Sequence, residues 1–333
     1  MHRVTDPQPG RAPGGWLGLC LLLAATAACG QGAWKPTRPV ELILVSGPGS
    51  GPDRNVRILQ KIWQDEKTLD VPIAVVNKPG GGGAVAYGYI HQKPGDGHAL
   101  VLGGATLLSG AILRNGVGHR DTTPVARLTG EYIAIAVRSD SPVKTGRDLI
   151  DTLKKSPTAL AIGLATAYGN INHQAIALAL KASGVDLPKV RTIIFQSGGA
   201  ALNALLGGHI DIVPLTVAVL KAPATAGQVR LVAITAPARL SGEFANIPTW
   251  KEQGINATAS AWRMMIAPPE LTRPQLAFWE AALRQATSTD EWKRDLEKYH
   301  LTDEFLTGAP LQRFLEEESA TLKSLLGDLG LLK

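Results

Sequence analysis

The sequence predicts an α/β protein of two lobes, each a mostly parallel sheet flanked by helices, with a ligand cleft between the lobes. Its 333 residues exceed the length of a typical single domain, which is about 100 to 150 residues. Short β-rich runs alternate with helical patterns along the chain, as is typical of parallel sheets covered on both faces. Apolar residues make up 45% of the chain and charged residues 19%, which favours a globular fold with a sizeable core.

The first lobe begins with a β-rich run at residues 40–45, VELILV. A glycine-rich turn follows, and apolar side chains then recur at helical spacing from Val56 to Trp63. The next unit comprises a strand at 73–77 and a helix at 84–91. A third strand is expected at 100–103.

The second lobe repeats this rhythm. The run at 132–138, YIAIAVR, is a longer expected strand at which the chain crosses into the second lobe. Further strands are expected at 159–163, 192–195, 210–213 and 231–235. The first two of these lead through loops of small polar residues into helices, as in the first lobe.

The stretch 262–267, WRMMIA, is interpreted as the strand that returns to the first lobe. Helices are expected after it at 274–286, 290–299 and 309–326. We therefore place the first lobe at residues 34–131 plus 255–333 and the second at 132–254. Two crossings between the lobes leave a cleft beyond the carboxyl ends of the strands, where ligands bind in open α/β sheets.

The N-terminus has the pattern of an export signal, which we place at residues 1–28. Arg3 and Arg11 precede the apolar stretch WLGLCLLLAATAA, which is shorter than the roughly 20 residues of a membrane-spanning helix. An uncleaved membrane anchor is the alternative. Cleavage before Cys29 would leave a lipid-modifiable cysteine, although the preceding residues fit that signal only in part. Because both cysteines lie in this leader, the mature chain can form no internal disulfide.

The charge of the mature chain is mildly positive. Without Arg3, Arg11 and Asp6, 32 basic and 27 acidic side chains remain, a net charge of about +5. These charges are spread along the sequence without the basic clusters that nucleic-acid binding requires, so we expect no nucleic-acid partner. The balance is compatible with an acidic small ligand.

Several loops share one design, in which a strand is followed by glycines or small polar residues and then by the start of a helix. They are VSGPGSGPDR at 45–54, KPGGGG at 78–83, ATAYGNINH at 165–173 and QSGG at 196–199. The amide hydrogens of a first helical turn lack intrahelical partners, and the helix dipole adds positive potential, so such a loop can hold a carboxylate or phosphate.

Each of these loops also has a purely structural interpretation. A glycine at such a turn can serve the turn alone, and KPGGGG is interpreted in this way. Ser197 is expected to cap a helix. Asn170 and Asn172 either cap a helix or bind ligand oxygens. Asp53 is expected to fix its loop, because its charge competes with a bound anion for the same helix dipole.

Enzyme signatures are missing from the sequence, and we expect neither catalysis, nor a cofactor, nor a metal. It contains no G-x-S-x-G nucleophile motif and no G-x-x-x-x-G-K-[ST] phosphate loop. Residues 81–86 imitate a dinucleotide fingerprint, but no acidic residue ends a following strand to bind a ribose. The histidines lack metal-ligand spacing. His173 alone is placed near the cleft.

The motifs taken together resemble the tripartite tricarboxylate transporter substrate-binding protein family, also called the Bug family, over residues 34–333. The resemblance rests on the order and spacing of RPVELILV, GPGSGPDRNVR, VVNKPGGGGAVA, PGDGHALVLG, YIAIAVRSDSPVKTGRDLI, GNINH, SGGAALNALLGGHIDIV, PTWKEQG and WKRDLEK. It implies a two-lobed, type II-like periplasmic binding protein that closes over a small organic carboxylate. The closed receptor would deliver its ligand to a large and a small membrane subunit. We expect a monomer.

In this family, backbone amides, hydroxyls and ordered waters hold the carboxylate between the opening loop and the loop that matches ATAYGNIN. Carried over to this chain, the ligand-binding residues are Gly47, Ser50, Gly51 and Thr106 in the first lobe, and Thr166, Gly169, Asn170, Asn172, Ser197, Gly198 and Gly199 in the second.

The chain departs from the family pattern at three places. Ser50-Gly51-Pro52 stiffens the helix entry, Tyr168 narrows the pocket or stacks on an aromatic acid, and residues 214–217, PLTV, replace polar residues. An aromatic or short aliphatic carboxylate is therefore the expected ligand. Two alternatives on the same scaffold are a ligand-sensing signalling receptor and a carboxylate-processing enzyme.

Overall fold

The structure is a computed structural model that describes residues 1–4, 10, 34–165 and 168–332. The chain divides into two compact units, Met1–Trp34 and Lys35–Lys333. Most of the expected export signal, Cys29 and the candidate Thr166 lie outside the described residues. The fold and the site described below belong to the second unit.

The first sheet has six strands in the order β11-β4-β10-β3-β1-β2. Their bounds are β1 Val40–Leu44, β2 Ile73–Asn77, β3 Ala99–Gly104, β4 Thr123–Gly130, β10 Arg263–Ala267 and β11 Thr302–Leu306. β1 pairs in parallel with β2 and β3, whereas β10 runs antiparallel to β3 and β4, and β11 antiparallel to β4. The sheet is therefore parallel on one side and antiparallel on the other.

The second sheet has five strands in the order β7-β6-β8-β5-β9. Their bounds are β5 Ile133–Arg138, β6 Ala161–Ala165, β7 Arg191–Phe195, β8 Ile212–Thr216 and β9 Val229–Ile234. β6 pairs in parallel with β7 and β8, and β5 pairs antiparallel with β8 and β9. Both sheets thus join a parallel α/β portion to an antiparallel portion.

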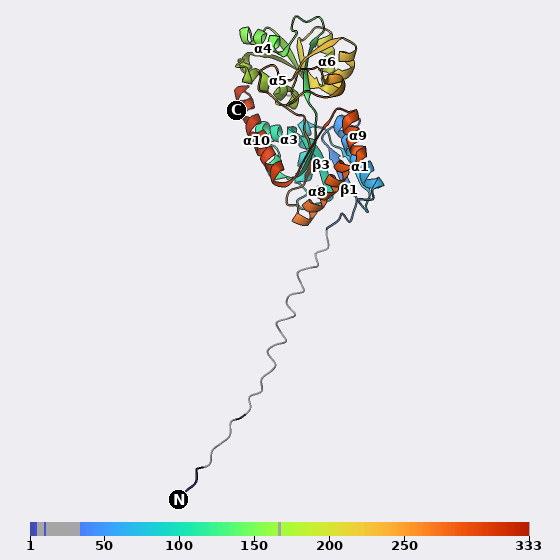
Figure 1. Cartoon of the computed structure of the whole chain (residues 1–333), viewed down its shortest axis with the longest axis vertical. Helices are drawn as coiled ribbons and strands as arrows, with labels where there is room; N and C mark the ends of the chain where they lie inside the picture. The colour runs from blue at the N-terminus through green and yellow to red at the C-terminus, as the bar shows by residue number, and fades with distance from the viewer. Residues whose placement is uncertain (5–9, 11–33, 166–167, 333) are drawn as a thin grey trace. The chain divides into compact units, whose positions relative to one another are not determined.

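The helices flank the two sheets in separate groups (Figure 1). Around the first sheet they are α1 Gly51–Asp65, α2 Ala84–His91, α3 Thr106–Arg114, α8 Arg273–Ser288, α9 Asp290–Lys298 and α10 Gly308–Asp328. Around the second sheet they are α4 Gly146–Lys155, α5 Ile171–Ala182, α6 Gly198–Leu206 and α7 Val217–Thr225. Short 3₁₀ turns occupy Gly81–Gly83, His119–Asp121, Leu187–Lys189 and Gly242–Phe244.

The expected two-sheet α/β fold is confirmed, and the sheets are mixed where mostly parallel sheets were expected. In the first sheet the difference comes partly from β4 and β11, which the sequence pattern did not reveal. All five strands of the second sheet were expected, and that sheet is mixed because β5 pairs antiparallel with β8 and β9. β4 contains Pro124 and Arg127, and β11 reads TDEFL, so neither shows the apolar run of a buried strand. α7 was also missed, because Pro223 interrupts its helical pattern.

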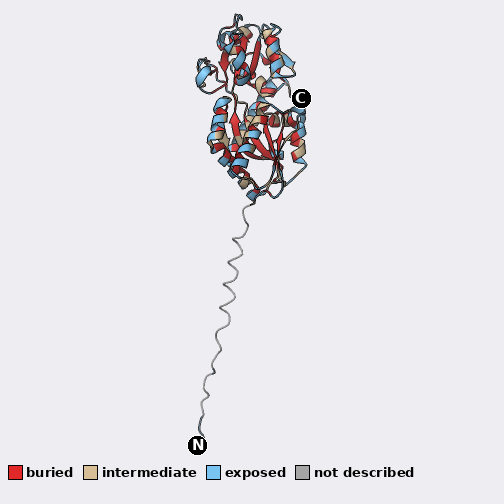
Figure 2. Ribbon diagram, turned by 90° about the vertical axis from the view of Figure 1, so that its right-hand side faces the viewer, coloured by how far each residue is buried: buried red, intermediate tan, exposed pale blue. Residues whose placement is uncertain are grey.

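Buried residues concentrate on the strands and on the inner faces of the helices (Figure 2). In the first sheet region, fully buried Trp63 of α1 packs against Trp279 of α8, with ring centroids 5.7 Å apart. Trp63 Nε1 also donates to the Ala282 carbonyl at 3.0 Å, which fixes α1 to α8. Burial of such aromatic side chains contributes much of the energy of a core.

Two neighbouring segments of chain cross between the sheets. Glu131 and Tyr132 lead from β4 to β5, and Ser260 to Trp262 lead back into β10. Tyr132 and Ser260 form an antiparallel bridge, and the Ala261 amide donates to the Glu131 carbonyl at 2.7 Å. The two crossings are therefore hydrogen-bonded to each other.

A third connection is made by packing. α10 begins beside the first sheet, and Leu325 near its end is buried in the core cluster of the second sheet with Ile176 and Leu180 of α5. Lys181 Nζ of α5 also donates to Ser324 Oγ at 2.9 Å. α10 consequently contacts both halves of the unit.

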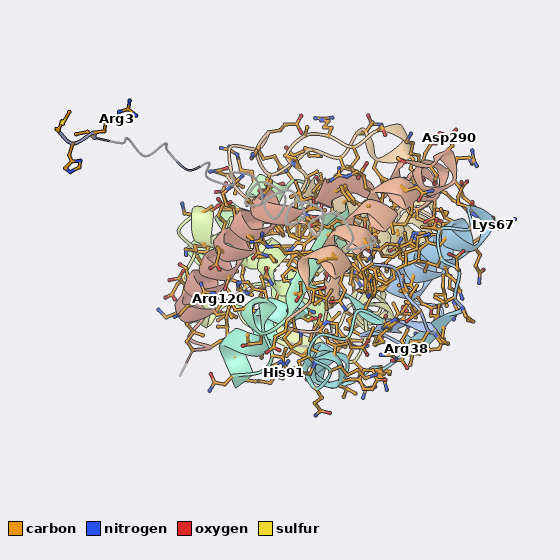
Figure 3. The ribbon with its side chains drawn as sticks, turned by 90° about the horizontal axis from the view of Figure 1, so that it is seen from below. Arg3, Arg38, Lys67, His91, Arg120 and Asp290 are labelled. Atoms are coloured by element: carbon orange, nitrogen blue, oxygen red, sulfur yellow. The ribbon has the colours of Figure 1, made fainter. Side chains whose placement is uncertain are left out.

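The surface cations are dispersed. Arg38, Lys67 and Arg120 project outward from separate places (Figure 3). Arg38 pairs with Asp96 at 2.7 Å, and Arg120 pairs with Glu316 at 2.6 Å. Among the helices of the described residues, none combines the length and the apolar character needed to cross a membrane.

Candidate functional site

A cavity of about 240 Å³ lies where loops of both sheets meet, and we call it the inter-sheet cavity. It is lined by Val45, Pro52, Leu102, Gly103, Gly104, Ala105, Thr106, Asn170, Ile171, Ala261, Trp262 and Arg263. These residues come from the ends of β1 and β3, the start of α5 and the crossing that leads into β10. The cavity therefore joins the first sheet, the second sheet and one of the segments between them.

The loop between β1 and α1 is held by its own side chains. Ser50 caps α1 by accepting from the Asp53 amide at 3.3 Å, and its hydroxyl also bonds Ser46 Oγ at 2.7 Å. The buried carboxylate of Asp53 accepts from the Gly49 amide at 3.0 Å, from Arg57 Nε at 2.9 Å and from Asn77 Nδ2 at 3.3 Å. The hydrogen bond from Arg57 lowers the pKa of Asp53, although burial opposes it. Asp53 thus shapes the turn, as predicted.

The candidate glycines of this loop lie in different surroundings. A Cβ on Gly47 would meet no atom within 4 Å, so Gly47 faces open space. A Cβ on Gly51 would lie 3.1 Å from Arg263 Nη2. Gly51 therefore allows the loop to approach the Arg263 guanidinium. The next residue, Pro52, lines the cavity.

Arg263 supplies a cation to the inter-sheet cavity. Its side chain is 12% exposed; Nη1 donates to Asn55 Oδ1 at 2.7 Å, and Nη2 donates to Glu131 Oε2 at 3.0 Å. Burial lowers the pKa of Arg263, whereas the Glu131 carboxylate opposes that effect. Of its five N–H donors, those two bonds use two, and no other described residue accepts from the remainder. Spare donors of a nearly buried guanidinium that lines a cavity can bind an anion.

The start of α3 is a second positive element in the cavity wall. Ala105 occupies the N-cap position and provides no side-chain cap, and among the described residues no side chain caps the first turn. The Leu108 amide donates to the Ala105 carbonyl at 3.1 Å, so the first-turn amides without a partner among the described residues are those of Thr106 and Leu107, beside the cavity that Ala105 and Thr106 line. Thr106 Oγ1 bonds the hydroxyl of buried Tyr87 at 3.1 Å, which fixes its rotamer. Burial raises the pKa of Tyr87.

The second sheet contributes the loop before α5. Asn170 caps this helix by accepting from the His173 amide at 2.9 Å, and its Nδ2 donates to the Ala165 carbonyl. Gly169, with φ +73°, donates to His173 Nδ1 at 3.0 Å and accepts from Gln174 Nε2 at 2.9 Å. Asn170 therefore reaches the cavity wall, whereas the backbone groups of Gly169 are used within the loop.

The remaining candidates lie away from the cavity wall. Asn172 is half-buried, and its side chain makes no hydrogen bond with the described residues. Ser197 caps α6 by accepting from the Ala200 amide at 3.1 Å, as predicted. A Cβ on Gly198 would lie 3.0 Å from Leu215 of β8, so this turn packs on the second sheet. Neither Ser197, Gly198 nor Gly199 lines the inter-sheet cavity.

Two of the places at which the sequence departs from the family pattern also lie outside the inter-sheet cavity. Tyr168 is on the wall of a different cavity, beside α5, so it does not narrow the inter-sheet cavity. Residues 214–216 belong to β8 and do not line the inter-sheet cavity either. Its apolar walls come instead from Val45, Leu102, Ile171 and Trp262.

Sequence reasoning missed Arg263, Ala105 and Trp262. Trp262 is 2% exposed, and its Nε1 donates to Glu318 Oε2 at 3.2 Å, which holds the indole as a rigid wall. The short signal GGAT after β3 shows the strand-to-helix turn, but nothing local marks Arg263. No group of three or more His, Cys, Asp or Glu among the described residues is arranged to hold a metal ion.

A comparison with protein families decides the classification. Residues 57–331 match the model described as the tripartite tricarboxylate transporter family receptor. The chain belongs to this family. A curated relative from Cupriavidus necator, named as a UPF0065 protein in the gbd 5′ region, is 26% identical over 327 residues, which cover 94% of this receptor and 96% of the relative.

Solved structures give the same result. A TctC solute-binding protein from Polaromonas is 26% identical, covers 88% of this receptor and 99% of its own chain, and has a TM-score of 0.74. MatC from Rhodopseudomonas palustris with bound malate is 23% identical, with 87% and 99% coverage and a TM-score of 0.70. Rpa4515 of R. palustris with adipate is 20% identical, with 89% and 98% coverage and a TM-score of 0.74. The last two similarities concern the fold.

Proposed function

We propose that this protein is a periplasmic receptor that binds a small organic carboxylate in the inter-sheet cavity for a tripartite tricarboxylate-type secondary transporter. Family membership supports the receptor role, and the malate and adipate bound by proteins of the same fold support the ligand class. The observation that carries the proposal is the Arg263 guanidinium, which lines the cavity with spare donors beside the uncapped start of α3.

In this proposal the carboxylate accepts hydrogen bonds from Arg263 and from the first-turn amides of α3. Glu131 and Asn55 hold the guanidinium in place, so little side-chain entropy is lost when the ligand binds. Asn170 and Ile171 contact the ligand from the second sheet. A ligand that touches both sheets stabilises the closed arrangement, because it binds that arrangement more tightly than the open one.

The apolar walls favour a ligand with an apolar body behind its carboxylate. Val45, Leu102, Ile171 and Trp262 offer few polar groups to a second hydrophilic end. A short aliphatic or aromatic carboxylate fits this lining better than a densely hydroxylated acid.

The following parts of the sequence prediction belong to this proposal. We propose that the other predicted ligand-binding residues border the path of the ligand, outside the wall residues Thr106 and Asn170. They are Gly47, Ser50, Gly51, Thr166, Gly169, Asn172, Ser197, Gly198 and Gly199. Residues 34–131 plus 255–333 and residues 132–254 are proposed as the lobes that move. The receptor is proposed to be an exported monomer with a lipid-modifiable Cys29, without enzymatic activity, that docks on a large and a small membrane subunit.

Isothermal titration of the purified chain against malate, adipate, benzoate and a neutral analogue, benzamide, tests the proposal. Carboxylates should bind with 1:1 stoichiometry, raise the melting temperature and be recovered unchanged, whereas benzamide should not bind. Binding of benzamide equal to that of benzoate would contradict the carboxylate site. Chemical conversion of a bound acid would favour the enzyme alternative, and ligand-dependent binding to a sensor domain would favour the signalling alternative.

A further inference from the structure

A second cavity, of about 200 Å³, lies beside α5, and we call it the α5 cavity. It is lined by Ile162, Tyr168, His173, Ile176, Ala177, Leu180, Leu187, Pro188, Val190, Thr192, Leu329 and Leu331. These residues belong to the second sheet, to α5 and the loop before it, to the turn at Leu187–Lys189 and the residues after it, and to the segment that follows α10. None of them lines the inter-sheet cavity.

The α5 cavity is mainly apolar because one face of α5 forms its wall. His173, Ile176, Ala177 and Leu180 follow the spacing i, i+3, i+4 and i+7, which places them on one side of the helix. None of the lining residues carries an acidic, lysine or arginine side chain. An apolar cavity of about 150 Å³ in another protein holds benzene, so this volume is sufficient for a substituted benzene ring.

One buried hydrogen-bond donor in the wall has no acceptor among the described residues. His173 is 3% exposed, and its Nδ1 accepts from the Gly169 amide at 3.0 Å, so the proton of the neutral ring is on Nε2. No described residue accepts a hydrogen bond from Nε2. Tyr168 and Thr192, the other polar residues of the wall, bond each other at 3.2 Å. A buried donor that faces a cavity favours an occupant with an acceptor.

The chemistry of this wall differs from that of the inter-sheet cavity. Burial lowers the pKa of His173 to about 4, so the ring is neutral near pH 7. With neither Lys nor Arg in the wall, the cavity offers no countercharge to a carboxylate. Burial of an unpaired charge there would be unfavourable.

We propose that the α5 cavity is a second binding site, which takes a small, neutral, mainly apolar molecule of about the size of a substituted benzene ring, with one acceptor directed at His173 Nε2. The site goes beyond the carboxylate-binding function and does not depend on it.

Ligand-observed NMR titration with acetophenone tests this site, because acetophenone joins an aromatic ring to one neutral acceptor. Ala177→Leu fills the cavity from α5, and Val190→Phe fills it from the opposite, half-buried wall. Each variant should weaken acetophenone binding by about tenfold or more, since the added carbons occupy the space of the ring. Ethylbenzene, which lacks the acceptor, should bind about fivefold more weakly than acetophenone.

The control variant Arg263→Met/Glu131→Gln alters the inter-sheet cavity and should bind acetophenone like the unmodified chain. Loss of acetophenone binding in this variant would place the compound in the inter-sheet cavity and overturn the proposal. The absence of saturable binding would overturn it as well, as would unchanged binding in the filled variants. If Ala177→Leu fails to fold, Val190→Phe decides alone. Equal binding of ethylbenzene would refute the role of His173.

Discussion

The two helices that follow β1 and β3 differ in how the amides of their first turns are hydrogen-bonded. At α1, Ser50 caps the helix, and the Asp53 carboxylate occupies the Gly49 amide and the positive end of the dipole. At α3, Ala105 supplies no cap, and the first turn borders the inter-sheet cavity. The loop with the more prominent glycine signal is thus satisfied internally, whereas at the start of α3 the amides of Thr106 and Leu107 are left for the proposed ligand. Arg263 lies beside Gly51 and lines the same cavity as the start of α3.

Substitution Ala105→Asp makes the start of α3 resemble that of α1. The new carboxylate would repel a bound carboxylate in the same cavity, so we expect affinity to fall by about a hundredfold or more. Isothermal titration measures the loss, with Ala105→Leu, which is similar in size to aspartate and cannot accept a hydrogen bond from the amides, as the control. If both variants lose the same affinity, crowding explains the effect and the role assigned to the amides is refuted.

Removal of the cation between the two loops should have the next largest effect. Arg263→Met/Glu131→Gln removes both charges of the pair, and we expect about 30-fold weaker carboxylate binding with a melting temperature close to the original. Arg263→Met alone should also be less stable, because it leaves Glu131 buried without its partner. Normal affinity in the double variant would show that amides suffice.

Substitution Asp53→Asn disturbs the internally satisfied loop and should alter stability more than binding. The folded-state pKa of Asp53 is lowered, so its contribution is complete above its ordinary value of 3.8 and is lost as pH falls through the lower folded-state value. We expect the variant to lose about 1 to 3 kcal/mol of unfolding free energy at pH 7. When the pH is lowered to 3, the variant should lose less further stability than the parent does. Urea unfolding at pH 7 and pH 3 checks this, and a large loss of affinity would contradict the comparison.

The smallest effect is expected for Gly47→Ala. The added methyl group would meet no atom within 4 Å, so affinity should change by less than about threefold and stability by less than about 0.5 kcal/mol. Gly49→Ala is the matched control, because φ +76° at that position strains an alanine and should lower stability by about 1 kcal/mol. A strong loss of carboxylate binding in Gly47→Ala would instead show that Gly47 contacts the ligand.

Local patterns in the sequence predicted the strand and helix rhythm and the helix cap at Ser197, and they left Asn170 open as either a cap or a ligand contact. Those features depend on residues within a few positions of one another, where spacing and residue type suffice. β4 and β11 were not predicted, because their burial is set by neighbouring strands rather than by their own composition. The edge position of β11 allows it to carry Asp303 and Glu304.

The candidate site was predictable only where it coincides with a loop motif. Thr106 and Asn170 both lie where a strand leads through a turn into a helix, and both line the cavity. Arg263 meets Asn55 and Glu131 across separations of 208 and 132 residues, and no local pattern encodes such a contact. No sequence pattern marks Ala105 either, because its importance lies in the helix cap that it does not provide.

The packing of α10 restricts how the two sheets can move. Closure about the two hydrogen-bonded crossings alone would leave two rotations open, a bend and a twist. Leu325 and Ser324 add a third, distant point of contact on α5, which opposes the twist. For the proposed closure we therefore expect rotation about a line through the crossings and the end of α10, with sliding of Leu325 along α5 as its shear component. In the proposed closure the C-terminal helix would thus be a second fixed point beside the two crossings.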